Sequence, residues 1–282
     1  MLQRDVAVYT PATLAEALRM LQEGGGSVRP VAGGTDAMVR LKDGYFRSIT
    51  AWVNLAGLRR ELAYIRRNGE WIEIGALTTF SELLASPIIR EGAPLLAQAA
   101  RTIGGPQIRN MGTIGGNLGT ASPAGDSLPP LYALEADVII NGNEMEAIDA
   151  LMIGPGRLKM VLGSLITGVR FKAQAPDELC TFEKLGLRAA HAISIASVAL
   201  RMSPRMARVA LGAVAPTVIR VPVAEAALVE PFDIPRALEA ARAAARPISD
   251  VRASEEYRRA MAGNLLLRGL LRLGVTPDAA AR

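Results

Sequence analysis

The sequence predicts a protein that contains both helices and strands and is divided into two domains near residues 172–178. Helix-like and strand-like segments are mixed along the chain before this point. The segment Lys172–Glu178 is polar and contains Pro176, and the pattern changes after it. The chain has 282 residues, half of them apolar, which is enough for two medium domains that each bury a core.

The first elements are a helix, a strand and a glycine turn. Residues 12–23 predict a helix, because Leu14, Ala17, Leu18 and Leu21 form one apolar stripe and Pro11 suits a first turn. A short strand over 29–32 runs into Gly33-Gly34. A helix or turn at 36–41 and a buried strand at 51–55 follow.

The middle of the chain opens with a hairpin. Segments 62–66 and 70–76 flank Asn68-Gly69, and this dipeptide is the strongest short-range hairpin signal. Ser81 is the expected cap of the next helix. Further expectations are helices over 95–103 and 129–135, strands over 137–141 and 165–171, and an irregular glycine-rich stretch over 107–126.

Beyond the boundary the pattern predicts fewer and longer elements. Residues 182–185 are extended, 193–202 are apolar, and 208–213 form a strand. Helices are expected over 235–245 and 254–273, the second capped by Ser254.

Composition excludes several kinds of site. The chain has one cysteine, Cys180, and one histidine, His191. An iron–sulfur cluster needs about four cysteines, and a zinc site needs three or four Cys, His or carboxylate ligands that usually include His or Cys. We therefore expect no metal site in this chain. Chemistry, if present, would come from an organic cofactor.

Charge and hydropathy point to a cytoplasmic protein that binds no nucleic acid. The formal net charge is +5, but the basic residues are scattered and aromatic residues make up only 4%. No apolar run reaches the roughly 18 residues that could span a membrane. The first residues are charged and mixed, so they do not resemble a signal peptide.

The first glycine loop, Val31–Asp36, follows a buried strand and reads VAGGTD. Glycine permits a left-handed backbone and close approach of an anion to the amides. Consecutive N–H groups can then form a concave nest for phosphate oxygens. An ordinary tight turn is the alternative.

The second glycine loop, Thr113–Asp126, mixes glycines with threonine, asparagine, serine and aspartate. Such a mixture suits a loop that hydrogen-bonds a long polar ligand, whereas a solvated loop is the alternative. Its spacing is neither that of the Gly-x-Gly-x-x-Gly dinucleotide fingerprint nor that of a P-loop. The expected ligand is nucleotide-like and is held by a different fold.

These residues resemble the FAD-binding medium subunit of the molybdenum hydroxylases, the family of xanthine, carbon monoxide and aldehyde dehydrogenases. Besides VAGGTD, the matching segments run in order along nearly the whole chain. They are IGALTTFSEL (74–83), GPQIRNMGTIGGN (105–117), ASPAGD (121–126), GPG (154–156), FEKL (182–185), LGAVAP (211–216) and RPISDVRASEEYRR (246–259).

The resemblance implies an α+β fold, with an FAD-binding domain of the vanillyl-alcohol oxidase (PCMH) type over residues 1–175 that has subdomains at about 1–57 and 58–175. A C-terminal domain of the CO dehydrogenase flavoprotein type, with an antiparallel sheet and helices, would cover 177–282.

The resemblance also implies residues that bind the cofactor. The first loop would hold the FAD pyrophosphate, the second would hold the remaining phosphate and the sugar and ribityl oxygens, and two apolar residues would pack near the adenine or the ring system. The residues are Val31, Ala32, Gly33, Gly34, Thr35 and Asp36; Thr113, Ile114, Gly115, Gly116, Asn117, Ser122 and Asp126; and Leu165 and Ile166.

Two further residues would neighbour the flavin ring. Lys184 matches a lysine beside the isoalloxazine, where a cation stabilises the anionic reduced flavin. His191 lies in a segment that resembles the stretch alongside the ring, and it would border the electron-acceptor site. A solvated surface position is the alternative for both. No residue is assigned a catalytic role.

The implied function is that of an electron-transfer subunit. A large molybdopterin subunit would hydroxylate the organic substrate, and a small subunit with two [2Fe–2S] clusters would pass electrons to the FAD of this chain. The acceptor would be NAD⁺, a quinone or oxygen, and the complex a dimer of heterotrimers. The alternative is a stand-alone FAD oxidase with its own substrate pocket. The pocket for the organic substrate would lie on another chain.

Overall fold

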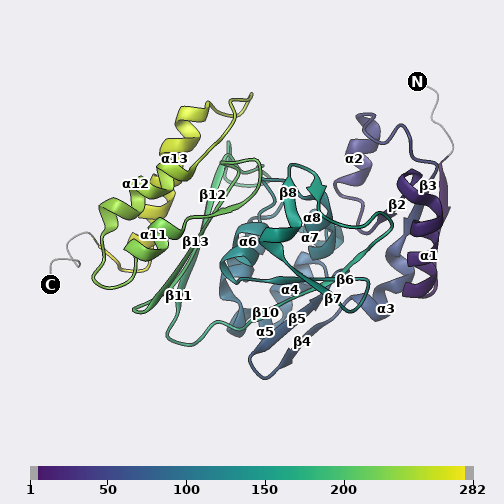
Figure 1. Ribbon diagram of the computed structural model, residues 1–282, viewed down its shortest axis with the longest axis horizontal. Helices are drawn as coiled ribbons and strands as arrows, with labels where there is room; N and C mark the ends of the chain where they lie inside the picture. Colours follow the sequence, from purple (N-terminus) through teal and green to yellow (C-terminus); the bar gives the residue numbers. More distant parts are fainter. Residues whose placement is uncertain (1–5, 277–282) are drawn as a thin grey trace.

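A small parallel sheet begins the structure, a computed structural model that describes residues 6–276 (Figure 1). The sheet has the order β1 (Ala7–Tyr9), β3 (Ala51–Asn54), β2 (Val28–Val31). Helix α1 (Leu14–Gly24) begins after Thr13, whose hydroxyl accepts the Glu16 N–H. Buried residues of α1 pack with Val53 in one core cluster, so the helix covers one face of the sheet.

A five-stranded antiparallel sheet forms the centre of the molecule. Its order is β4 (Ile65–Asn68), β5 (Trp71–Gly75), β10 (Ile166–Lys172), β6 (Asp137–Ile140), β7 (Glu144–Ala147). The hairpin expected at Asn68-Gly69 is confirmed, and Gly69 takes the left-handed φ of +60° that the turn needs. The helices that share its main core are α4 (Phe80–Ala85), α5 (Pro87–Gly92), α6 (Pro94–Thr102), α8 (Ile114–Thr120), α9 (Leu128–Ala133) and the short α10 (Ile148–Leu151).

Two local predictions were wrong. Ser81 does not cap α4, because Thr79 does so in a capping box with Glu82. Residues 107–126 are not wholly irregular, since they contain α7 (Pro106–Met111) and α8. Pro106 occupies the first turn of α7, and the Thr113 hydroxyl caps α8, so both helices form despite the glycines.

The C-terminal domain is an antiparallel sheet with helices. Its order is β11 (Leu179–Leu185), β12 (Ala196–Ser203), β13 (Met206–Gly212), β14 (Ile219–Arg220). Helices α11 (Pro222–Ala227), α12 (Ile234–Ala244) and α13 (Glu255–Arg272) share a core with β12 and β13. The predicted cap of α13 is confirmed, because the Ser254 hydroxyl accepts the Tyr257 N–H.

The remaining elements are short. They are α2 (Ala37–Lys42), α3 (Arg59–Leu62), β8 (Met152–Gly154), β9 (Arg157–Leu158), and the 3₁₀ turns Gly25–Ser27 and Leu55–Leu58. No helix within residues 6–276 is both long and apolar enough to cross a membrane.

Polar contacts join the C-terminal sheet to the preceding domain. The Gln98 side chain on α6 accepts the Phe182 N–H and donates to the Cys180 carbonyl. Glu135, after α9, pairs with Arg208 at 2.9 Å and with Arg220 at 3.4 Å. Burial acts to raise the pKa of Glu135, but the two arginines outweigh it and hold that pKa below its ordinary value.

We predict that Glu135→Gln lowers the free energy of unfolding near neutral pH by at most about 1 kcal/mol, because the pairs are partly exposed. A carboxylate with a lowered pKa stabilises the fold above its ordinary pKa and loses this effect as the pH falls. Urea unfolding should therefore show wild type and variant converging below about pH 4.3. Glu70→Gln, which breaks an exposed pair with Lys172, is the control and should change little.

Candidate functional site

The first glycine loop leaves the carboxyl end of β2 and enters α2. Gly34 has φ +70°, and a Cβ on Gly33 would lie 1.7 Å from the Met111 carbonyl oxygen, so both positions require glycine. Among the described residues, the backbone N–H groups of Gly33, Gly34, Thr35 and Asp36 have no acceptor. Four consecutive free donors form the concave, positive environment that binds an anion.

The second glycine segment contains the start of α8, and the backbone N–H groups of its first turn already have acceptors within the chain. Ile114 N–H donates to Thr78, Gly115 to Ala76, Gly116 to the Thr113 hydroxyl and Asn117 to the Thr113 carbonyl. These amides are therefore not free for a phosphate. A ligand at the start of α8 would therefore be contacted by exposed backbone atoms other than these amides and by polar side chains.

The two segments lie against each other. Thr120 donates to the Asp36 carboxylate at 3.2 Å, and the same carboxylate pairs with Arg40 at 2.8 Å. A Cβ on Gly116 would meet only the Thr113 hydroxyl oxygen within 4 Å, at 3.0 Å, so the helix presents bare backbone at this point. Sequence reasoning missed this contact of Thr120, because the two side chains lie 84 residues apart along the chain.

Asp126 is buried, 8% exposed, and both its carboxylate oxygens are bonded within the chain. Oδ2 accepts from Lys184 Nζ at 2.5 Å, and Oδ1 accepts from the Ser194 hydroxyl at 2.5 Å. Lys184 also donates to the Thr102 carbonyl at 3.0 Å. We call Asp126, Lys184 and Ser194 the interdomain latch, because the carboxylate belongs to the first domain and its two donors to the second.

The latch changes what Asp126 can do. Burial raises the pKa of its carboxyl above the ordinary value, and the contacts with Lys184 and Ser194 oppose this. That Asp126 accepts a hydrogen bond from a hydroxyl of the cofactor stays a prediction. The structure shows instead that its carboxylate forms an ion pair with Lys184. Sequence reasoning missed Ser194, a buried serine whose partner lies 68 residues away.

His191 lies on the exposed loop between β11 and β12. Its imidazole packs on Gly105, where a Cβ would come within 2.1 Å of the ring carbon Cε1. Its carbonyl accepts from the Arg188 guanidinium at 2.7 Å. The loop that carries the histidine therefore rests on the start of α7, beside the residues that follow α6.

The remaining predicted residues lie in or beside the cores. Leu165 is buried with the α1 cluster, and Ile166 is buried in the main core at the start of β10. Val31 and Ala32 are half-buried at the end of β2. The Ser122 hydroxyl accepts the Ala124 N–H within its own turn.

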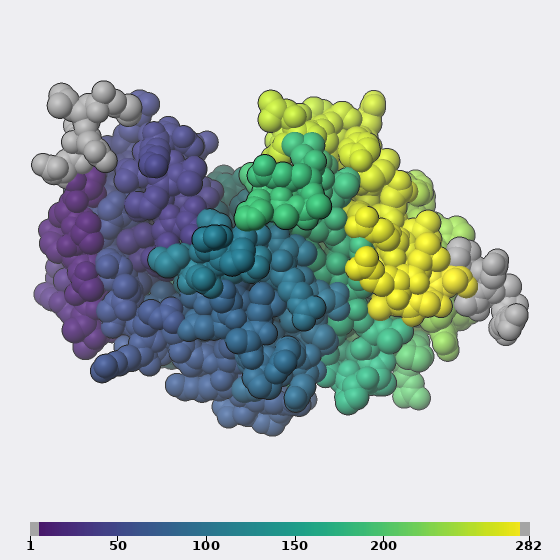
Figure 2. Space-filling view, turned by 180° about the vertical axis from the view of Figure 1, so that it is seen from behind, coloured from purple at the N-terminus to yellow at the C-terminus, as the bar shows by residue number. Residues whose placement is uncertain are grey.

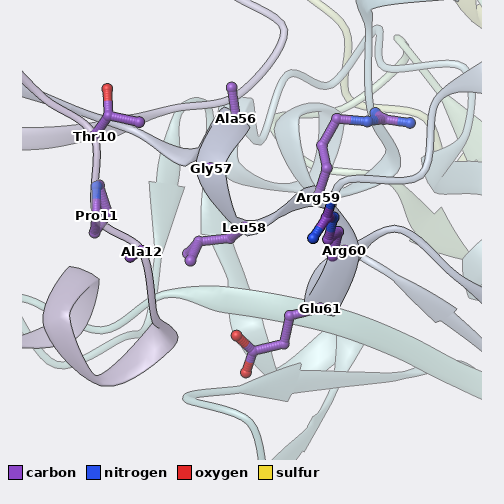
Figure 3. Close-up of a pocket in the computed structure, with 9 residues that line it drawn as sticks. All are labelled: Thr10, Pro11, Ala12, Ala56, Gly57, Leu58, Arg59, Arg60 and Glu61. Atoms are coloured by element: carbon purple, nitrogen blue, oxygen red, sulfur yellow. The ribbon is translucent and has the colours of Figure 1, made fainter.

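The surface is hollowed beside the first glycine loop. Figure 2 shows a depression between the slate-blue segment near residue 40 and the green segment that follows β11. A cavity of about 620 Å³ lies at the carboxyl ends of β1 and β3, where Thr10–Ala12 face Ala56–Leu58 (Figure 3). Neither glycine segment contributes a residue to the lining of this cavity. In residues 6–276, no three His, Cys, Asp or Glu side chains gather to hold a metal.

Two family models together match most of the chain. The FAD binding domain in molybdopterin dehydrogenase matches residues 4–171, and the CO dehydrogenase flavoprotein C-terminal domain matches residues 181–273. The α+β fold is thus that of an FAD-binding domain followed by this C-terminal domain.

Similar proteins support the same grouping. The carbon monoxide dehydrogenase medium chain of Hydrogenophaga pseudoflava is 30% identical, covering 93% of this chain and 94% of the relative. The putative xanthine dehydrogenase FAD-binding subunit of Escherichia coli is 31% identical, covering 90% and 91%. A solved carbon monoxide dehydrogenase from H. pseudoflava superposes with a TM-score of 0.91 at 29% identity, covering 97% and 99%.

We predict that Ser194→Ala lowers the free energy of unfolding by about 1–3 kcal/mol, because it leaves a buried carboxylate oxygen without its donor. Denaturant unfolding of the full chain measures the change. Ser197→Ala is the matched control, since Ser197 is also buried and its hydroxyl makes no hydrogen bond among the described residues. Equal effects of the two substitutions would contradict the latch.

Proposed function

The chain belongs to the family of FAD-binding subunits of the molybdopterin dehydrogenases, and on this premise we propose that it carries electrons from a partner subunit to an external acceptor. The acceptor would be NAD⁺, a quinone or oxygen. When bound, FAD would supply the redox chemistry, because flavins mediate one-electron and hydride transfer.

The four free amides at Gly33–Asp36 carry the proposal. They suit the FAD pyrophosphate, because consecutive free N–H groups form a positive nest that binds phosphate oxygens. The bare backbone at Gly116 would allow the cofactor to approach α8 closely. The Asn117 and Ser122 side chains would supply the remaining polar contacts.

Lys184 would face the redox-active end of the cofactor. Its ammonium group is nearly buried and is held by Asp126 and Thr102 at fixed distances. A fixed cation favours negative charge nearby, which suits a flavin that becomes more electron-rich on reduction. His191, on the loop that rests on Gly105, would border the path of the acceptor.

The other cofactors of such a complex would lie on partner subunits. One cysteine and one histidine cannot hold two [2Fe–2S] clusters. We propose a small subunit with these clusters, a large subunit with the molybdopterin, and an assembly of two heterotrimers.

We predict that the complex, purified through a tag on a partner subunit, contains one FAD for each copy of this chain. Its visible absorbance should bleach on addition of the organic substrate only when all three subunits are present, since electrons must reach the flavin through the clusters. A complex without flavin would contradict the proposal, as would substrate turnover by this chain alone.

We predict that Gly116→Leu removes FAD from the complex. Within the chain, a Cβ there would meet only the Thr113 hydroxyl oxygen, in a tight contact at 3.0 Å, so lost flavin reports exclusion of the cofactor only where the fold is intact. Flavin absorbance per protein measures occupancy, and circular dichroism checks the fold.

Gly119→Leu is the control for this substitution. Gly119 lies on the same helix, and a Cβ there would meet nothing within 4 Å. It should retain flavin. Full flavin content in both variants would contradict the contact between α8 and FAD.

A further inference from the structure

Helix α13 carries a buried cation that the proposed function does not use. Arg258, in the first half of this helix, is 3% exposed. An arginine side chain is almost never fully buried unless its charge is paired and its donors are bonded. The partners of Arg258 therefore show what the buried charge holds in place.

Arg258 joins one carboxylate to two backbone carbonyls. Its Nη2 donates to Asp250 Oδ1 at 2.6 Å, and its Nη1 donates to the carbonyls of Ile195 at 2.8 Å and Ala213 at 3.1 Å. Ile195 directly precedes β12 and Ala213 directly follows β13, so one side chain ties together neighbouring ends of two paired strands. Within residues 6–276 neither carbonyl has another donor.

The same two strand ends contact the second glycine segment of the first domain. Ser194, immediately before the first of these carbonyls, donates to the Asp126 carboxylate. The Ala213 N–H donates to the Pro123 carbonyl at 2.8 Å. The backbone that carries both of these donors is therefore fixed by Arg258, although its own three hydrogen bonds all lie within the second domain.

Helix α13 also holds the other end of the loop between β11 and β12. The Arg268 guanidinium, which is half exposed, donates to the Lys184 carbonyl at 3.2 Å. The Ile195 N–H donates to the Leu185 carbonyl at 2.8 Å and closes the loop. One helix thus holds the backbone at both ends of this loop, while the interdomain latch holds the side chains there.

We propose that Arg258 is a positioning residue for the flavin site. By fixing the two strand ends, it sets where the interdomain latch places the Lys184 ammonium group and the loop that carries His191. This inference rests on the proposed function, in which Lys184 faces the redox-active end of FAD.

The test compares Arg258→Met with Arg252→Met in the complex co-expressed with its partner subunits. Both arginines pair with the Asp250 carboxylate, but the Arg252 guanidinium bonds only Asp250 among the described residues. Both substitutions remove one cation from the same carboxylate. Only Arg258→Met also leaves two strand-end carbonyls without a donor.

Hydrogen exchange of peptides covering 185–195 measures the hold on the loop. We expect Arg258→Met to speed this exchange at least about tenfold, because a buried hydrogen-bond acceptor without a donor favours local opening. Arg252→Met should leave it unchanged. Leu266→Ala, which shortens a buried side chain elsewhere on α13, controls for general destabilisation and should not single out the loop.

Arg258→Lys keeps the test decisive if Arg258→Met does not assemble. Lysine preserves the charge opposite Asp250, but its single nitrogen cannot replace the two guanidinium nitrogens that span the carboxylate and the carbonyls. We expect faster exchange of 185–195 in this variant too. Full rescue by lysine would show that charge alone suffices and would overturn the positioning role.

The midpoint potential of the flavin measures the consequence for the site. A fixed cation beside the flavin favours its reduced form, so Lys184→Gln and Arg258→Met should each shift the potential to more negative values. If Arg258 acts through Lys184, the double variant should shift no further than Lys184→Gln alone.

Unchanged exchange of 185–195 in the Arg258 variants, or an equal change in Leu266→Ala, would overturn the proposal. So would additive shifts of the potential in the double variant, or no shift in either single variant. An assembled complex without flavin would instead defeat the proposed function, and the exchange measurement alone would then decide whether Arg258 holds the loop.

Discussion

The interdomain latch is the contact on which the arrangement of the site depends. The Asp126 carboxylate holds Lys184 at the end of β11 and Ser194 just before β12, so it fixes both ends of the loop that carries His191. An unpaired buried carboxylate or ammonium group would be costly, so each domain needs the other to satisfy these charges. The position of Lys184 is thereby set by the first domain, which also contains the free amides of Gly33–Asp36, although the lysine belongs to the second.

Much of the fold follows from local signals in the sequence. The Asn68-Gly69 hairpin, the apolar stripe of α1 and the Ser254 cap are each determined within a few residues, and the structure confirms them. The stretch 107–126 is less irregular than its glycine content predicts. Pro106 and Thr113 start helices there, and tertiary contacts such as Gly115 against Ala76 hold them in place.

The candidate site divides in the same way. Both glycine segments are recognisable in the sequence, but the amides of α8 that are occupied are not. Their acceptors, the carbonyls of Thr78 and Ala76, lie far from α8 along the chain. Sequence reasoning missed the contacts of Ser194 and Thr120 for the same reason. Family resemblance correctly pointed to an FAD-binding subunit, while the contacts of each residue come only from the three-dimensional structure.

The latch also limits how such subunits can recombine. The two domains correspond to separate sequence families, and a gene fusion could join one from each of two relatives. A hybrid whose second domain lacked a cation at position 184 or a hydroxyl at 194 would bury the carboxylate of Asp126 without its donors. We therefore expect a hybrid of two relatives to fold well only where a first domain with the acidic residue is joined to a second domain that has both hydrogen-bond donors.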